Sequence, residues 1–204
     1  MFAALRRLIP SRFRADRPVV PVVRLSGTIG FSTPLKPGLT LAGIARSLDR
    51  AFSTKRACAV ALAINSPGGS AAQSHLIHTR IRALAAEHKR PVIAFVEDVA
   101  ASGGYMIATA ADEIVADASS IVGSIGVVSA SFGFDRLIER IGVERRVHVA
   151  GEQKVMLDPF QPEKREDVAR LKALQKDIHE LFISLVKERR GKKLKGPEKA
   201  LFSG

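Results

Sequence analysis

The amino-acid sequence predicts an α/β fold built from repeated strand–helix units with a largely parallel sheet. Two short apolar runs, at 57–64 and 91–96, lack the polar alternation of a half-exposed strand. Continuous apolar runs are typical of strands buried on both faces, as in parallel sheets. Each run is followed by a helical pattern, so strands and helices alternate along the chain.

The individual elements follow in chain order. Strands are predicted at 19–25, 57–64, 91–96, 113–116, 121–128 and 144–149, and a loop at 27–38. Helices are predicted at 39–53, 71–89, 102–111, 134–141 and 162–190. In the last segment apolar residues recur every three or four positions until Gly191, which predicts one long C-terminal helix.

Length and composition set the domain organisation. The chain has 204 residues, 46% of them apolar and 25% charged, which is ordinary for a globular protein and argues against extensive disorder. One domain of this size has a substantial core, whereas two domains would each be small. Pro18 and Pro21 end a basic segment. We therefore predict a basic N-terminal arm at 1–17 and a single domain at 18–204.

The positive charge is concentrated near the two ends of the chain. The formal net charge is +12, and most of it comes from arginines within 1–24 and from lysines and arginines within 187–199. Such ends suit an anionic membrane surface or a nucleic acid, although a solvated tail and helix end would look the same. The chain has one Tyr and no Trp, and it has no nucleic-acid-binding motif, so nucleic acid is not an expected partner.

Neither a membrane span nor a secretory signal stands out. The longest uncharged stretch, 118–134, is short for a transmembrane helix and is diluted by serine and glycine. The apolar part of the first ten residues is too short for a secretory signal. We expect a cytoplasmic protein, with peripheral contact to the inner face of the membrane as an alternative.

The single cysteine, Cys58, lies in the apolar run 57–64. One cysteine cannot form an intramolecular disulfide, and the spacing of zinc or iron–sulfur ligands is missing. We interpret Cys58 as a small buried hydrophobe and predict neither a metal nor another cofactor.

Three segments follow predicted strands, in the place where open α/β sheets bind ligands. In Asn65–Gly69, two adjacent glycines free backbone amides that could hold a developing oxyanion, although a plain turn is an equal alternative. In Ala100–Tyr105, Ser102 falls at a helix start, where free N–H groups favour negative charge. An N-cap is the commoner role of such a serine.

The third segment, Gly151–Lys154, supplies a candidate base. A serine hydroxyl is activated by a histidine, a desolvated lysine or a terminal amine. A lysine serves only where burial lowers its pKa, because the neutral amine is the base. Most lysines are solvated, so Lys154 alone indicates little.

Taken together, the motifs INSPGGS, EDVAASGGYMIATAADEIVA, VGSIGV and AGEQK…DPF resemble the signal peptide peptidase A (protease IV) family of serine peptidases. The resemblance runs from about Val19 to the end, with the motifs in the family's order. That family shares its fold with the Clp proteolytic subunit and the crotonases, so a Clp/crotonase-like fold is implied. A family motif usually continues beyond Gly204, so we expect a truncated C-terminal end. The N-terminal membrane anchor that family members often carry is not recognisable.

The resemblance also implies roles for five residues. Ser102 is implied as the nucleophile and Lys154 as its general base, and the amides of Gly69 and Gly103 as the oxyanion hole. Ser124, in the Gly-Ser-Ile-Gly segment, matches a family serine that can hydrogen-bond the lysine.

A Clp-type Ser-His-Asp triad is the main alternative to this dyad. By resemblance to that family it would need a histidine about 25 residues after Ser102, and the sequence around Val127 contains none. The five histidines lie outside the motifs and suit solvated or core positions: His75, His78, His88, His148 and His179. We therefore prefer a lysine base.

By resemblance, the chain is expected to be a serine endopeptidase that cleaves hydrophobic peptides, such as signal peptide remnants or membrane-derived fragments, through an acyl-enzyme. The family further implies a homo-oligomer in which serine and lysine can come from neighbouring protomers. Two other classes remain open: a crotonase-like acyl-CoA enzyme that uses the same oxyanion hole, and a non-catalytic scaffold at a membrane.

Overall fold

The computed structural model describes residues 18–30, 38–151 and 154–204. The chain forms two compact units, one comprising the chain up to Ile125 together with Leu185–Gly204, and the other Gly126–Ser184. The predicted basic arm at 1–17 lies outside the described residues, and a single domain over 18–204 stays a prediction.

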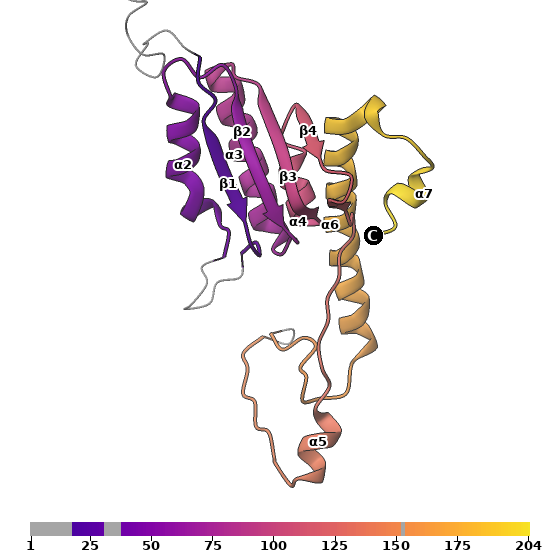
Figure 1. Ribbon diagram of the computed structural model, residues 1–204. Helices are drawn as coiled ribbons and strands as arrows, with labels where there is room; N and C mark the ends of the chain where they lie inside the picture. The colour runs from indigo at the N-terminus through magenta and orange to yellow at the C-terminus, as the bar shows by residue number, and fades with distance from the viewer. Residues whose placement is uncertain (1–17, 31–37, 152–153) are drawn as a thin grey trace, which may run out of the picture. The chain divides into compact units, whose positions relative to one another are not determined.

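The first unit is built on a parallel sheet, which in the described residues has five strands (Figure 1). The first four lie in the order β1 (Val22–Ser26), β2 (Val60–Ser66), β3 (Val92–Ala101) and β4 (Glu113–Ala116). The fifth, β5 (Ile121–Gly123), pairs with the last residues of β3, whereas β4 pairs with its first half. Every ladder is parallel. The predicted α/β fold is confirmed.

The helices α2 (Leu41–Ser53), α3 (Ala71–His88) and α4 (Gly103–Ala108) pack on one face of this sheet. Alternate strand residues point to that face and form a common core with the helices. The core includes Val23, Leu25, Leu48, Phe52, Leu62, Ile64, Ile77, Ile81, Val92 and Ala94. Burying a side chain of this size typically contributes about 1.5–3 kcal/mol, so this face holds the first unit together.

The opposite face of the sheet is largely open, which corrects the prediction of strands buried on both faces. Arg24, Ala63, Phe95 and Val115 lie in register across four strands on that face. Phe95 and Val115 are each 43% exposed, and Val22 on the same face is 61% exposed. Parallel sheets are normally covered on both faces, so the apolar runs indicate a covered sheet, whereas the described residues of the first unit cover one side only.

A long C-terminal helix, α6 (Arg165–Arg190), is present as predicted. Its last six residues belong to the first unit. There Val186 is fully buried, and the Arg189 guanidinium donates to the carbonyls of Thr109 and Ala111 and to the carboxylate of Asp112. The short elements η2 (Gly191–Lys193) and α7 (Glu198–Leu201) follow.

Two further predictions are wrong. Residues 144–149 form no strand; they are exposed and lie in the second unit. The described residues of that unit contain one short helix, α5 (Asp135–Arg140), and all but the last six residues of α6. A β-favouring pattern becomes a strand only beside a partner edge, and no described strand pairs with it. Cys58 is exposed and lies two residues before β2 begins, which corrects its interpretation as a buried hydrophobe.

His78 is a buried titratable group in the first unit. It lies on α3 with 7% of its surface exposed, and its Nε2 atom has no hydrogen-bond partner. Burial, together with the nearby charges of Arg189, His75 and Arg82, lowers the pKa of His78 to about 4, although a hydrogen bond to the backbone of Thr109 opposes this. The fold therefore holds His78 neutral.

This lowered pKa predicts a loss of stability in acid. The stabilising contribution of neutral His78 should be complete above about pH 6.5 and disappear as the pH falls to about 4, because the unfolded chain takes up the proton first. The expected change in the unfolding free energy is about 3 kcal/mol, measurable by urea denaturation across this range. His78→Gln should make the unfolding free energy nearly independent of pH over this range, whereas His148→Gln, at an exposed histidine, should retain the wild-type dependence on pH. A wild-type slope in His78→Gln would refute this assignment.

Candidate active site

The strands β2, β3 and β5 of the first unit end in register at one edge of the sheet. Ser66 of β2 lies in register with Ala100 of β3, and Ala101 lies in register with Gly123 of β5. Because these strands are parallel, the residues that follow them emerge at the same carboxyl edge. The structure thus brings four predicted site residues to this edge: Gly69, Ser102, Gly103 and Ser124.

Ser102 has a backbone conformation that residues other than glycine rarely adopt. Its φ is 50° and its ψ is −121°, which typically costs on the order of 1–3 kcal/mol. Two backbone hydrogen bonds hold it, since its N–H donates to Gly123 over 2.8 Å and its carbonyl accepts from Met106 over 2.9 Å.

The side chain of Ser102 does not cap the helix. Ser102 occupies the N-cap position of α4, but its hydroxyl makes no capping hydrogen bond. By contrast, Thr40 and Ser70 accept hydrogen bonds from the first turns of α2 and α3. The commoner role of a serine at a helix start is therefore absent here, and a sharp strand-to-helix turn leaves the hydroxyl available for chemistry.

Gly68, the first of the two glycines after β2, packs directly against Ser102. A Cβ atom on Gly68, whose φ is 101°, would lie 2.9 Å from Ser102 Cβ, from Gly103 N and from the Ala101 carbonyl oxygen. Gly69 has a φ of 142°. No residue with a side chain fits at Gly68 without displacing the serine turn, so the prolyl-glycyl-glycine segment serves close backbone contact.

Ser66 holds the Pro67–Gly69 segment in place through hydrogen bonds. It is fully buried at the end of β2, its hydroxyl donates to the Gly27 carbonyl over 2.7 Å, and it accepts from the Gly68 N–H over 3.2 Å. A Cβ on Gly104 would lie 2.4 Å from the Ser66 carbonyl oxygen, so the first turn of α4 also lies tight against Ser66.

Two backbone donors near Ser102 are unused. Within the described part of the chain, the N–H groups of Gly69 and Gly103 donate to no protein acceptor. Gly103 begins α4, whose first N–H groups have no partner within the helix. Free amides beside a serine hydroxyl can stabilise the negative oxygen of a tetrahedral intermediate.

Ser124 and Lys154 lie in different units. Ser124 has a φ of 52°, is exposed, and follows Gly123, whose carbonyl binds the Ser102 N–H. Lys154 is exposed in the second unit, where its N–H donates to the Gly151 carbonyl over 3.1 Å. The pairing of Lys154 with Ser102 stays a prediction.

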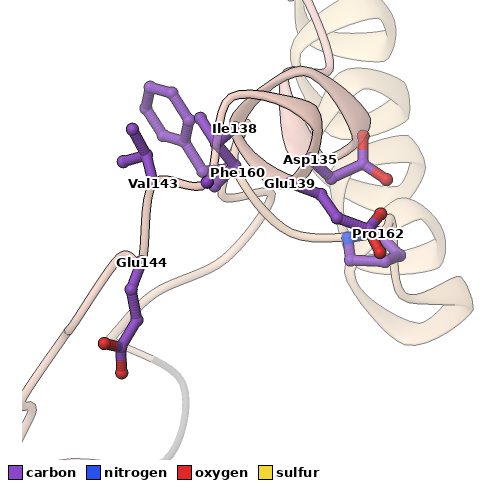
Figure 2. A pocket seen from close by; sticks show the side chains of 8 residues that line it. Asp135, Ile138, Glu139, Val143, Glu144, Phe160 and Pro162 are labelled. Atoms are coloured by element: carbon purple, nitrogen blue, oxygen red, sulfur yellow. The ribbon is translucent and has the colours of Figure 1, made fainter.

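The second unit contains a hollow of about 460 Å³ (Figure 2). Carboxylates and apolar side chains both line it, and the labelled residues are Asp135, Ile138, Glu139, Val143, Glu144, Phe160 and Pro162. None of the predicted site residues borders this hollow. In the described residues no group of three or more His, Cys, Asp or Glu side chains could hold a metal ion.

Peptidase family S49 matches residues 85–200, more than half of the chain. The chain belongs to this family. The matched segment contains Ser102, Ser124 and Lys154, and the resemblance to signal peptide peptidase A is confirmed. The serine protease SPPA of Arabidopsis thaliana chloroplasts is 36% identical over 158 residues, which cover 74% of this chain and 23% of that protein.

A second relative carries a different name. A Brucella melitensis protein named Na(+)/H(+) antiporter NhaA is 65% identical over 201 residues, covering 98% of this chain but 27% of that protein. The chain thus spans about a quarter of the length of these relatives. Among the helices of the described residues, none is long and apolar enough to cross a membrane. The printed name is that of the whole relative, of which this chain covers about a quarter.

Among solved structures, a ClpP1 mutant from Listeria monocytogenes aligns with 84% of this chain and 72% of its own chain, at 16% identity and a TM-score of 0.49. A likeness of this size supports no argument here.

Two residues that touch the site, Ile29 and Ser74, are not recognisable as site residues from the sequence motifs. Ile29, placed in the loop 27–38, is almost fully buried and hydrogen-bonds to the backbone on both sides of Gly69. Ser74, on α3, is fully buried beside Gly103. A lone isoleucine between a threonine and a glycine was the only signal in the sequence.

The close contact at Gly68 predicts a selective loss of activity. Gly68→Ala should abolish peptide cleavage, because its Cβ would displace the serine turn. Gly27→Ala is the matched control: φ at Gly27 is 96° and a Cβ there would meet nothing within 4 Å. Both variants pay a similar backbone cost of about 1 kcal/mol, visible in thermal melts. Full cleavage by Gly68→Ala would contradict the described contact.

Proposed function

We propose that the chain is a serine endopeptidase with a Ser102–Lys154 dyad. Family S49 membership supports a peptidase. The observation that carries the proposal is a strained, uncapped Ser102 beside the unused amides of Gly69 and Gly103. Such an arrangement serves a nucleophile whose oxyanion is held by backbone N–H groups.

In the proposed reaction the assembled particle buries the amine of Lys154, which is exposed in the single chain. The uncharged amine then takes the proton of the Ser102 hydroxyl as the hydroxyl oxygen attacks a peptide carbonyl carbon. The amides of Gly69 and Gly103 hold the resulting oxyanion. The protonated amine then gives its proton to the leaving amine as the peptide bond breaks. Water attacks the acyl-enzyme in the same way and releases the second product.

A lysine suits this site better than a histidine. The Ser102 side chain makes no hydrogen bond with any described residue. The base that activates Ser102 must therefore come from a residue that does not contact its hydroxyl in the single chain. The buried histidine of the first unit, His78, lies with Thr109 and Arg189 instead. Lys154 is the family's base by motif, and Ser124, adjacent to the residue that binds Ser102, is proposed to hydrogen-bond and orient its amine.

We further propose that the active particle is a homo-oligomer. In the described residues of the second unit, Phe182 is the one buried hydrophobic residue, whereas Val128 and Phe132 are 88% and 78% exposed. The open sheet face also exposes Val22, Phe95 and Val115, beside the Arg24–Glu97 ion pair. Surfaces of this kind normally meet another protein surface, and further copies of the chain supply one.

The proposed substrates are hydrophobic peptides, such as signal peptide remnants or membrane-derived fragments, in keeping with the family motifs. Peripheral contact with anionic membrane from the cytoplasmic side is part of the proposal. It is supported by the exposed lysines at the C-terminal end, Lys192, Lys195 and Lys199.

Removing either member of the dyad should abolish cleavage. We expect Ser102→Ala and Lys154→Ala to lower kcat for a fluorogenic hydrophobic peptide by at least about 10³-fold, because nucleophile or base is lost. Thermal melts should match the wild type, since both side chains are uninvolved in the core. Lys187→Ala, at a partly exposed lysine paired with Glu198, is the control and should remain active. Turnover of an acyl-CoA thioester that survives Lys154→Ala would favour a crotonase-like enzyme instead.

Mixing the two inactive variants tests how the site is assembled. If serine and lysine meet across a subunit boundary, Ser102→Ala and Lys154→Ala protomers exchanged into one particle should regain part of the activity, because some sites then receive both intact residues. Gel filtration with light scattering should show an oligomer. A monomer with full activity would contradict the proposed assembly.

A further inference from the structure

The backbone of Ile29 lies against Gly69 and hydrogen-bonds to the residue before it and to the residue after it. The Ile29 N–H donates to the Gly68 carbonyl over 2.8 Å, and the Ile29 carbonyl accepts from the Ser70 N–H over 2.9 Å. These two bonds tie the residues on both sides of Gly69 and leave the Gly69 N–H unused. A Cβ on Gly69 would lie 2.2 Å from the Ile29 carbonyl oxygen, so the two backbones are in close contact.

Ile29 is itself held from its other side. The Gly30 N–H donates to Leu39 over 2.8 Å, and the Leu39 N–H donates to Thr28 over 2.9 Å. Ile29 is 1% exposed. The backbone at Ile29 is therefore hydrogen-bonded to two other segments, at Gly68–Ser70 and at Leu39, and these bonds fix its position.

The side chain of Ile29 reaches the second glycine. Its Cδ1 atom lies 3.2 Å from the position that a Cβ on Gly103 would take. Ser74 meets the same position with its Oγ atom at 2.2 Å, and that hydroxyl donates to the Ser70 carbonyl over 2.8 Å. Ser70 follows Gly69 directly. Two buried side chains thus connect the peptide of Gly69 to the peptide of Gly103.

We propose that Ile29 and Ser74 are positioning residues that set the separation of the Gly69 and Gly103 amides. The inference rests on the proposed role of these amides as the oxyanion hole. Ile29 acts through its backbone on Gly69 and through its terminal methyl on Gly103, and Ser74 fills the space that a larger residue at 103 would need.

A positioning role predicts an effect on the chemical step. The amides bind an oxygen whose negative charge appears only in the transition state, so a shift of either amide lowers kcat and leaves KM nearly unchanged. Misplacement of a catalytic group by about 1 Å can cost about 10²-fold in rate. Losing one methyl contact should cost less, on the order of 10-fold.

Ile29→Val tests the methyl contact, because it deletes Cδ1 and leaves the backbone hydrogen bonds in place. The matched control is Ile81→Val, which deletes the same group from a fully buried position on α3. Both should lower the melting temperature similarly. Only Ile29→Val should reduce kcat by on the order of 10-fold, with KM within about twofold, and weaken inhibition by a peptide aldehyde in parallel.

The role of Ser74 is tested by adding a methyl group at position 103 and removing the hydroxyl at position 74. Gly103→Ala alone should be inactive, because its Cβ overlaps the Ser74 hydroxyl. Adding Ser74→Ala removes that oxygen, so the double variant should recover at least about 10-fold in kcat over Gly103→Ala. Equal activity of the single and double variants would overturn the proposed contact.

These outcomes separate the inference from the proposed function. If Ile29→Val and Ile81→Val share the wild-type kcat while Ser102→Ala is inactive, the positioning role is wrong and the peptidase stands. If Ser102→Ala cleaves peptides at the wild-type rate, the proposed function has failed whatever Ile29 does.

Discussion

The candidate site depends on the close approach of two backbone turns, one after β2 and one after β3. The carbonyl of Ser66, the Gly68 backbone and the Ser102–Gly104 turn are packed so tightly that side chains at 68 or 104 would overlap backbone atoms. Lack of space requires glycine at both positions, and at 68 the positive φ favours glycine as well. The approach places the Gly68–Gly69 backbone, with its unused amide at 69, against the turn that contains Ser102 and the unused amide of Gly103. The chemistry proposed for the chain follows from that geometry.

Strand pairing in the sheet holds these two turns together. Ser66, Ala100 and Val122 occupy one level across β2, β3 and β5, and the carbonyl of Gly123 then binds the N–H of Ser102. An unfavourable φ at Ser102 persists because the core beneath it fixes both the strand before it and the helix after it. The strain is located at Ser102, whereas the ordinary helix starts at Thr40 and Ser70 are capped.

The sequence was most informative where structure is decided locally or within one sheet. Apolar periodicity located α3 and α6, and the motif positions after β2 and β3 predicted which residues share the carboxyl edge. Residues 144–149 were misassigned, because a strand depends on a partner edge that the pattern does not contain. The open sheet face beside Phe95 was missed for a related reason, since an apolar run does not say what covers it. The role of Ile29 depends on a contact between segments about 40 to 74 positions apart.

The central claim is that the Ser102 hydroxyl is a nucleophile activated by Lys154. Labelling with a fluorophosphonate, followed by intact-mass measurement and peptide mapping, tests it most directly. The account predicts one adduct per chain on Ser102, formed at least about 10²-fold more slowly in Lys154→Ala. An adduct on another residue, or an unchanged labelling rate without the lysine, would contradict it.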